Sequence, residues 1–142
     1  MCHRYVLRSV SVAQNVIVRI NHSPVDFDVK YLVARVVVVK LREVKADVPV
    51  AKIDSAARKV LKQHKLDKAF VHSTGHGLGL EIHEAPRLAQ KEKAKLKAGM
   101  VITIEPGVYL EGLGGIRIED TILVTENGCQ IMTPTSKEFV HL

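Results

Sequence analysis

The sequence is poor in the residues that mark several classes of protein. It has no tryptophan, its aromatic residues amount to 4%, and its two cysteines, Cys2 and Cys129, lie far apart. So few aromatic residues, with no zinc-finger spacing, argue against a nucleic-acid-binding protein. Two distant cysteines form no disulfide framework, which favours a reducing, cytoplasmic setting. The apolar runs are too short for a signal-peptide core or a bilayer span, so we expect no membrane partner.

Glycine and net charge divide the chain into two parts. All nine glycines lie between Gly75 and Gly128. Residues 1–46 hold eight Lys and Arg against three Asp and Glu, a net charge of +5, whereas residues 47–142 hold thirteen against twelve, a net of +1. The overall charge of +6 therefore comes mainly from a Val- and Arg-rich segment of unclear origin. Because the motifs lie elsewhere, this distribution also argues against a nucleic-acid partner.

The first part of the chain has the composition of β-strands. β-branched residues dominate segments 16–20 and 34–40, and the sequence Asn-His-Ser-Pro at 21–24 is typical of a turn between them. The simpler interpretation of this part is a hairpin or a sheet edge without chemistry.

From Pro49 the apolar residues follow helical spacing. The stripe between Ile53 and Leu61 predicts a helix with one face against a sheet. Asp47 is the expected N-cap, with Pro49 in the first turn. We expect this helix to end near residues 64–66.

The rest of the chain predicts short strands joined by turns. Residues 101–105 and 116–124 alternate between two faces, as strands with one buried face do. Glu-Asn-Gly at 126–128 is typical of a hairpin turn, and residues 130–133 are the expected return strand. The charged segment 91–97 is expected to form a short helical turn or a loop.

One stretch, residues 72–86, combines three histidines with three glycines. Each glycine costs up to about 1 kcal/mol in a helix, so this is not a metalloprotease helix. Alternate glycines instead suit a backbone that approaches a ligand closely. The imidazole of His76, with strand carboxylates from Glu105 and Glu119, would make a site for a divalent ion. A carboxylate there would take a proton from a metal-activated water.

Each of these residues also has an interpretation without chemistry. His76 would be a structural histidine in a glycine-rich loop, and Glu105 an exposed strand end. Glu119 would pair with Arg117 as a surface ion pair of little energetic value. Their order and the surrounding sequence favour the metal site over these alternatives.

The motifs themselves resemble those of a known family. They are Gly-His-Gly-x-Gly-Leu at 75–80, His-Glu-x-Pro at 83–86, Glu-Pro-Gly at 105–107 and Arg-x-Glu-Asp at 117–120. From about Asp47 onward, the chain resembles the C-terminal part of the catalytic domain of the pita-bread metallopeptidases. These include Xaa-Pro aminopeptidase, Xaa-Pro dipeptidase (prolidase), methionine aminopeptidase and creatinase. The stretch Gly-Gly-Ile-Arg-Ile-Glu-Asp at 114–120 is similar to the Xaa-Pro branch.

The resemblance implies a role for each candidate residue. It implies the metal ligands His76, Glu105 and Glu119, the catalytic residues His83, Glu105 and His72, and Arg117 as an organising contact behind the ligands. In the family, Glu105 would be the general base, and Glu119 would bridge two metals. The implied reaction is metal-dependent hydrolysis of the bond before a proline at the second position of a peptide substrate.

One part of the family's metal site has no match. The family uses two further aspartates on adjacent strands upstream of the helix, whereas this chain offers only Asp26, Asp28 and Asp47 there. We therefore expect a truncated site that holds at most one divalent ion, Mn²⁺ first and Co²⁺ or Zn²⁺ as alternatives. The other interpretation is a catalytically inactive pita-bread module that binds peptides or protein partners.

The implied architecture is α+β, a partial pita-bread fold formed by residues 47–142. We expect a curved antiparallel sheet with helices on its outer face, including a second, short helix near 92–97, and the carboxylates on its concave face. A missing half of the pseudo-symmetric domain would leave apolar surface uncovered, which favours a homodimer.

Overall fold

The computed structural model describes residues 9–11, 16–20, 33 and 43–134. Three sequence-based expectations lie outside the described residues, namely the turn at 21–24, the strand at 34–40, and any part played by Asp26 and Asp28.

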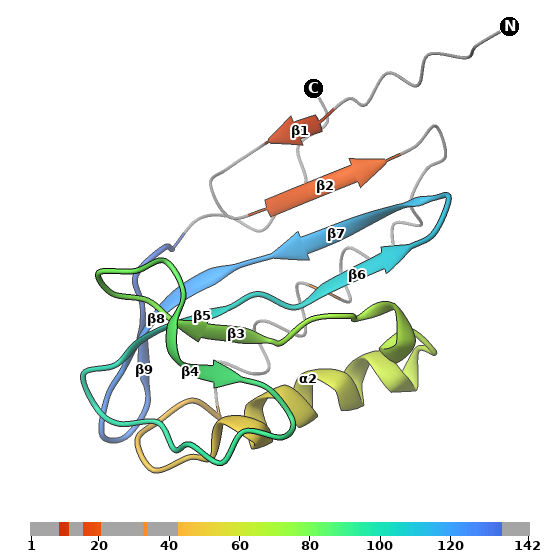
Figure 1. Ribbon diagram of the computed structural model, residues 1–142. Helices are drawn as coiled ribbons and strands as arrows, with labels where there is room; N and C mark the ends of the chain where they lie inside the picture. The colour runs from red at the N-terminus through yellow and green to blue at the C-terminus, as the bar shows by residue number, and fades with distance from the viewer. Residues whose placement is uncertain (1–8, 12–15, 21–32, 34–42, 135–142) are drawn as a thin grey trace, which may run out of the picture.

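Two antiparallel sheets form the body of the described fold (Figure 1). Their strand orders are β1-β2-β7-β6 and β4-β3-β5-β8-β9. The strands are β1 (Ser9–Ser11), β2 (Val16–Ile20), β3 (Gly75–Gly77), β4 (Glu84–Leu88), β5 (Val101–Ile104), β6 (Gly107–Leu110), β7 (Gly114–Ile118), β8 (Asp120–Val124) and β9 (Cys129–Ile131). β2 confirms the strand predicted at 16–20, and it pairs with β7 along its whole length. β9 confirms the return strand after the hairpin turn.

The two sheets meet at a corner that two chain segments cross. β5 leads into β6 through Glu105 and Pro106, and β7 leads into β8 through Glu119. Pairing continues on both sides of the corner, with Ile104 opposite Asp120 and Gly107 opposite Arg117. Pro106 lacks the N–H that a strand ladder needs, so regular pairing stops there. The corner therefore brings the two glutamates together on neighbouring chain segments.

The helix α2 (Val50–Gln63) covers one face of both sheets. Its N-terminal half packs Val50 and Ile53 against β4, β5 and β8, and its C-terminal half packs Ala57 and Leu61 against β6 and β7. Burial of each Val, Ile or Leu side chain among these stabilises the fold by about 1.5–3 kcal/mol, and burial of Ala57 by less. The predicted apolar stripe is thus confirmed. In the part of the chain that the structure describes, no helix is both long and apolar enough to cross a membrane.

The start of α2 differs from the prediction. Pro49 occupies the N-cap position and no side chain caps the helix, while Asp47 has a left-handed backbone with φ of 64°. The first helical N–H, that of Val50, donates to the carbonyl oxygen of Ala94 at 3.0 Å. The predicted Asp47 cap was wrong because a backbone carbonyl from a distant loop satisfies this group instead. The helix ends at Gln63, next to the predicted end.

Segment 91–97 is a loop, so the second helix expected near 92–97 was wrong. Pro49 and Lys95 form an isolated antiparallel bridge, and the backbone N–H of Leu96 donates to the carbonyl of Val48 at 3.0 Å. The side chain of Leu96 is fully buried. These bonds to the chain before α2 use the groups that helical hydrogen bonds would need.

Candidate functional site

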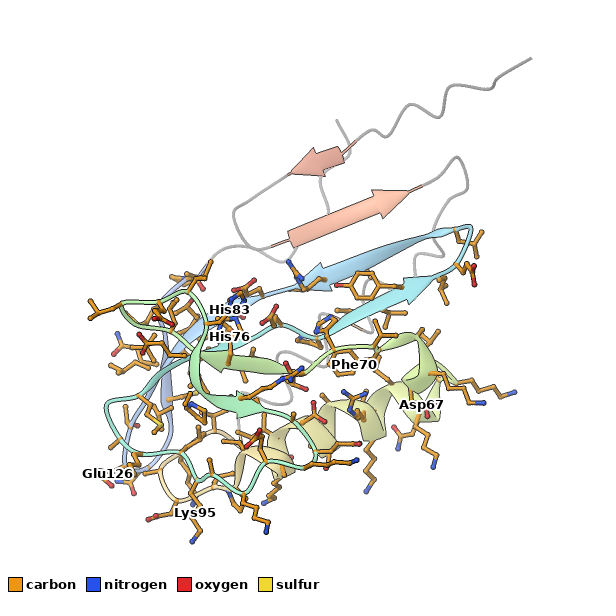
Figure 2. The ribbon with its side chains drawn as sticks, viewed as in Figure 1. Asp67, Phe70, His76, His83, Lys95 and Glu126 are labelled. Atoms are coloured by element: carbon orange, nitrogen blue, oxygen red, sulfur yellow. The ribbon has the colours of Figure 1, made fainter. Side chains whose placement is uncertain are left out.

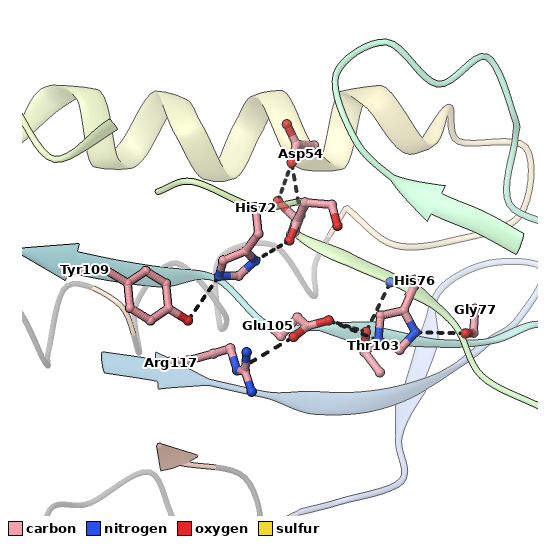
Figure 3. A network of polar contacts seen from close by, with 10 residues as sticks. Asp54, His72, His76, Gly77, Thr103, Glu105, Tyr109 and Arg117 are labelled. Carbon is pink, nitrogen blue, oxygen red and sulfur yellow. Dashed lines mark hydrogen bonds and ion pairs between the residues drawn. The ribbon is translucent and has the colours of Figure 1, made fainter. Parts of the chain in front are cut away.

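Glu105 lies at the corner of the two sheets and is held from two sides. Its backbone N–H donates to the carbonyl oxygen of Thr74 at 2.7 Å, and the Thr103 hydroxyl donates to its Oε1 at 3.1 Å (Figure 3). The same hydroxyl accepts a bond from the backbone N–H of His76 at 3.1 Å. Thr103 thereby links the strand that carries the histidine to the carboxylate.

His76 points its outer ring nitrogen at Glu105. Its Nδ1 lies 2.9 Å from the carbonyl oxygen of Gly77, which only accepts hydrogen bonds, so Nδ1 carries a proton. Its Nε2 lies 3.1 Å from Oε1 of Glu105. An unprotonated Nε2 and a carboxylate oxygen are both electron donors, so a positive charge has to lie between them, either a proton or a metal ion. This backbone-fixed orientation is the one that metal-binding histidines use.

Glu119 and Arg117 add charges beside this contact. Burial raises the pKa of Glu119 above its ordinary 4.5 and the negative charge of Glu105 raises it further, whereas Arg117 and His76 lower it. Arg117 Nε lies 3.7 Å from Oε2 of Glu105, beyond hydrogen-bond range. This buried nitrogen has no hydrogen-bond partner among the residues that the structure describes. The two carboxylates therefore repel each other, and Arg117 compensates only in part.

The donor set has the right chemistry for a divalent cation but does not form a closed cage. An imidazole and two carboxylates suit Mn²⁺, Co²⁺ or Zn²⁺. Across the described ranges, 9–11, 16–20, 33 and 43–134, no three His, Cys, Asp or Glu side chains are grouped closely enough to hold an ion. His76 and Glu105 are in contact, while Glu119 is coupled to both through its charge. The ligand roles of these three residues, and the organising role of Arg117, stay predictions.

His72 lies on the other side of Glu105, between two aromatic rings. Its ring centroid is 5.0 Å from that of Phe70 and 5.5 Å from that of Tyr109. Its Nδ1 donates to the carbonyl of Ser73 at 2.8 Å, which leaves Nε2 to accept from the Tyr109 hydroxyl at 3.2 Å. A side chain on Gly107 would meet this imidazole, since a Cβ there would lie 2.9 Å from His72 Nε2. The histidine is therefore fixed in one tautomer.

His83 stacks edge-on against His76, with ring centroids 4.4 Å apart (Figure 2). Unlike His76, it is exposed. Both rings line a cavity of about 930 Å³ whose wall also includes His72, Glu105 and Arg117. The structure therefore brings five of the six predicted site residues to one cavity. The sixth, Glu119, is half-buried at the corner of the two sheets and is not part of the cavity lining.

Sequence reasoning missed several residues that build this site. Thr103 had a usable signal, because strand alternation places it on the same face as Glu105. Tyr109 had none, since it lies 37 residues from His72 and only the tertiary fold brings the two side chains together. Asp54 is a fully buried acid on α2, and its signal was the arginine four residues later, at the spacing of a helical ion pair.

The glycines of β3 allow the neighbouring strands to approach closely. A Cβ on Gly75 would lie 1.9 Å from the carbonyl oxygen of Thr103, and one on Gly77 would lie 2.4 Å from that of Ala85. The backbone of β3 therefore approaches the neighbouring strands β5 and β4 closely, and the predicted approach to a ligand stays a prediction.

The sequence matches the profile of metallopeptidase family M24 over residues 28–126, more than half of the chain. This chain belongs to metallopeptidase family M24. The Xaa-Pro dipeptidase of Pyrococcus furiosus is 54% identical over 88 residues, which cover 62% of this chain and 25% of that protein. The M24 chain thus spans about a quarter of the length of this curated relative.

Solved structures agree with the family on the fold. The Xaa-Pro dipeptidase from Bacillus anthracis superimposes with a TM-score of 0.82 and 37% identity, over 89% of this M24 chain and 37% of that one. The N-terminal domain of FACT complex subunit SPT16 from chickpea, 18% identical, superimposes with a TM-score of 0.73 over 86% of this chain and 33% of that one. The chain has part of the α+β pita-bread fold, as the sequence predicted.

The raised pKa of Glu119 predicts a pH effect on the M24 chain without metal. The pKa of Glu119 is higher in the folded than in the unfolded state, so ionisation of this group lowers the free energy of unfolding. The contribution of Glu119 to stability is therefore more favourable at low pH, and this advantage is lost as pH rises through the raised pKa. Glu119→Gln, which stays neutral, should therefore melt higher than the unaltered chain at pH 7 but not at pH 4. Since Glu119 is only half-buried, solvent screens the effect, and we expect a rise of roughly 2–4 °C in Tm.

Thermal melts followed by circular dichroism in EDTA, from pH 4 to pH 8, test this. Glu111→Gln serves as the control, because Glu111 is exposed in the β6–β7 turn. A Glu119→Gln protein that melts lower than the unaltered chain at pH 7 would contradict the assigned direction.

Proposed function

We propose that this chain carries the histidine and glutamate half of a metal-dependent Xaa-Pro peptidase site. In this proposal His76, Glu105 and Glu119 hold a divalent ion, and the 930 Å³ cavity receives a peptide with proline at its second position. The family, the fold and the similarity to Xaa-Pro dipeptidases support the reaction class.

The observation that carries the proposal is the contact between His76 Nε2 and Glu105 Oε1 at 3.1 Å. Because Gly77 fixes the proton on Nδ1, this contact needs either a proton or a metal ion between the two atoms, and the repulsion between Glu105 and Glu119 favours a positive charge there. A divalent ion would remove both problems, since it would replace the proton and neutralise the two carboxylates.

Each residue has a distinct task in this mechanism. A bound divalent ion supplies Lewis acidity, which polarises a carbonyl and makes water more acidic. Glu105, oriented by Thr103 and Thr74, is placed to accept the proton of the attacking water. His83, exposed beside His76, is placed to stabilise charge on the carbonyl oxygen of the substrate. His72 forms the opposite wall of the cavity.

We expect the proposed site to be incomplete. The two strands that precede α2 in the described part of the chain, β1 and β2, have the sequences Ser-Val-Ser and Val-Ile-Val-Arg-Ile, and the first 25 residues contain no acid at all. β2 pairs with β7, with Ile17 directly opposite Arg117, so the backbone of β2 runs beside the site. Because β1 and β2 supply neither of the two upstream aspartates that the family uses, we expect one weakly held ion per chain, with Mn²⁺ as the first candidate.

Isothermal titration with Mn²⁺, combined with a proline-release assay on Xaa-Pro dipeptides and longer Xaa-Pro peptides, tests the proposal. We expect one weak binding site, and slow release that stops when a chelator removes the metal. Two tight sites per chain would contradict the single-ion assignment. No Mn²⁺ binding together with no release would contradict the peptidase assignment.

The second candidate is an inactive pita-bread module that binds peptides or protein partners. Among the described residues, no three metal-binding side chains are grouped closely enough to hold an ion, and this favours the second candidate. This candidate predicts that the chain binds an Xaa-Pro peptide with equal affinity in Mn²⁺ and in EDTA and never cleaves it. The peptidase proposal predicts tighter binding in Mn²⁺.

A further inference from the structure

The segment that carries His72 is held by two residues of α2 that lie outside the cation-binding set. We propose that Asp54 and Arg58 form a positioning pair, which fixes His72 through its backbone and Glu105 through Thr74. The inference rests on the proposed function and adds two residues to its machinery. Figure 3 shows Asp54 on α2 reaching toward the segment that bears His72.

Arg58 makes three directed hydrogen bonds with its guanidinium group. Nε donates to Asp54 Oδ2 at 2.7 Å, and the two terminal nitrogens donate to the carbonyl oxygens of Phe70 at 2.9 Å and His72 at 2.6 Å. The guanidinium also lies 4.4 Å from the centre of the Phe70 ring. The planar fork thus holds both ends of a three-residue segment at once, a geometry that a lysine ammonium cannot reproduce.

Asp54 also helps to fix Glu105, the residue proposed as general base. Its carboxylate is fully buried, and Oδ1 accepts from the backbone N–H of Thr74 at 3.1 Å and from the Thr74 hydroxyl at 2.8 Å. The carbonyl oxygen of Thr74 in turn accepts the backbone N–H of Glu105 at 2.7 Å. One carboxylate on α2 is therefore two hydrogen bonds away from Glu105, and it is linked to His72 through Arg58.

This arrangement is better suited to positioning than to stability. A buried ion pair gains little over apolar residues of similar size, because desolvation offsets most of the attraction. The chain between η1 (Asp67–Ala69) and β3 is irregular, and the carbonyls of Phe70 and His72 receive from Arg58 the bonds that a strand ladder would otherwise supply. What the pair determines is where the His72 imidazole sits against Tyr109.

Arg58→Lys tests the positioning role, because it keeps the charge and removes the fork. In the metal-free protein, the imidazole signals of His72 in a side-chain ¹H–¹⁵N correlation spectrum should shift, while those of the exposed His83 stay in place. Because Arg58 reaches the proposed ligand Glu105 only through Asp54 and Thr74, the affinity for Mn²⁺ should fall by less than the roughly tenfold loss that follows when a direct partner of a ligand is altered. Lys59→Gln is the matched control, since Lys59 is the next residue of α2 and is exposed; it should change neither quantity.

Chemical rescue separates positioning from general loss of stability. Arg58 lines a second cavity of about 370 Å³ beside Phe70 and His72, so Arg58→Ala leaves a space that a small cation can enter. Low millimolar guanidinium, far below the concentrations that unfold proteins, should restore the His72 signals. Methylammonium at the same concentration has the charge without the fork and should not restore them. Asp54→Asn, which keeps an acceptor for Thr74, provides a second variant if Arg58→Ala fails to fold.

The outcomes distinguish the two proposals. If Arg58→Lys and Asp54→Asn only lower Tm and leave the His72 signals and the Mn²⁺ affinity unchanged, the pair is a stabilising contact and the inference fails. If the unaltered chain binds no Mn²⁺ but the His72 signals shift and are rescued, the positioning pair stands and the proposed function fails.

Discussion

Glu105→Ala is expected to weaken Mn²⁺ binding by roughly 100-fold or more, because altering residues behind a ligand already costs 10–100-fold and Glu105 would be a ligand itself. The change removes the carboxylate that meets His76 Nε2 at 3.1 Å and leaves the Thr103 hydroxyl without its acceptor. Any proline release should disappear with it, because the same carboxylate would accept the proton of water. Titration calorimetry with Mn²⁺ and the release assay measure the two effects.

Glu92→Ala is the matched control for this prediction. Glu92 lines the same cavity but is exposed on the 91–97 loop, away from the corner of the two sheets. Its loss should leave Mn²⁺ affinity and release unchanged. Proline release that survives Glu105→Ala would exclude the mechanism proposed for this chain.

Gly75→Ala is expected to be the most destabilising small substitution in the sheet. The added Cβ would lie 1.9 Å from the carbonyl oxygen of Thr103 and 2.7 Å from its carbonyl carbon, and backbone atoms cannot move aside as a flexible side chain can. The strands β3 and β5 would have to separate, at a cost of about 3 kcal/mol or more. The corresponding fall in Tm is roughly 10 °C or more, measurable by circular dichroism.

Gly128→Ala provides the comparison, because its Cβ would have 4.0 Å to its nearest neighbour and the residue lies in the β8–β9 turn. We expect a change in Tm of no more than about 2 °C. Similar melting temperatures for the two alanine variants would show that the close approach of β3 to β5 is not needed for the fold. A Gly75→Ala protein that folds normally but loses Mn²⁺ would instead place the glycine's role at the metal.

Local patterns were sufficient to predict most elements of the second half of the chain. Alternation at 101–105 predicted β5, because a strand with one buried face repeats every two residues. Alternation at 116–124 predicted a single strand, which the fold divides at Glu119 into β7 and β8 of two different sheets. The spacing of apolar residues after Pro49 predicted α2, because a helix with one buried face repeats about every 3.6 residues. The expectations that failed, the Asp47 cap and the helix near 92–97, share one cause. In the fold these two segments hydrogen-bond to each other, and no local pattern contains that information.

The site was predictable as a set of residues but not as an arrangement. The motifs singled out His76, Glu105 and Glu119, yet the contact between the first two depends on β3 pairing with β5 and on the corner at Pro106. Arg117 was expected to organise the site. The pairing of β7 with β6 brings Arg117 close to Glu105, and this contact depends on the tertiary fold. The buried Nε of Arg117 has no hydrogen-bond partner in the described part of the chain.

The amino-acid sequence by itself determined the family, the order of the motifs, the strand periodicity and the types of donor atom available, because these are properties of composition and spacing. The tertiary structure alone decided which of those donors meet, how Gly77 fixes the tautomer of His76, and how Asp54 and Arg58 support the segment around His72. The physical reason is that such contacts join residues far apart in the chain. Their distances depend on how the sheets bend and pack against α2, and that packing is a collective property of the whole core.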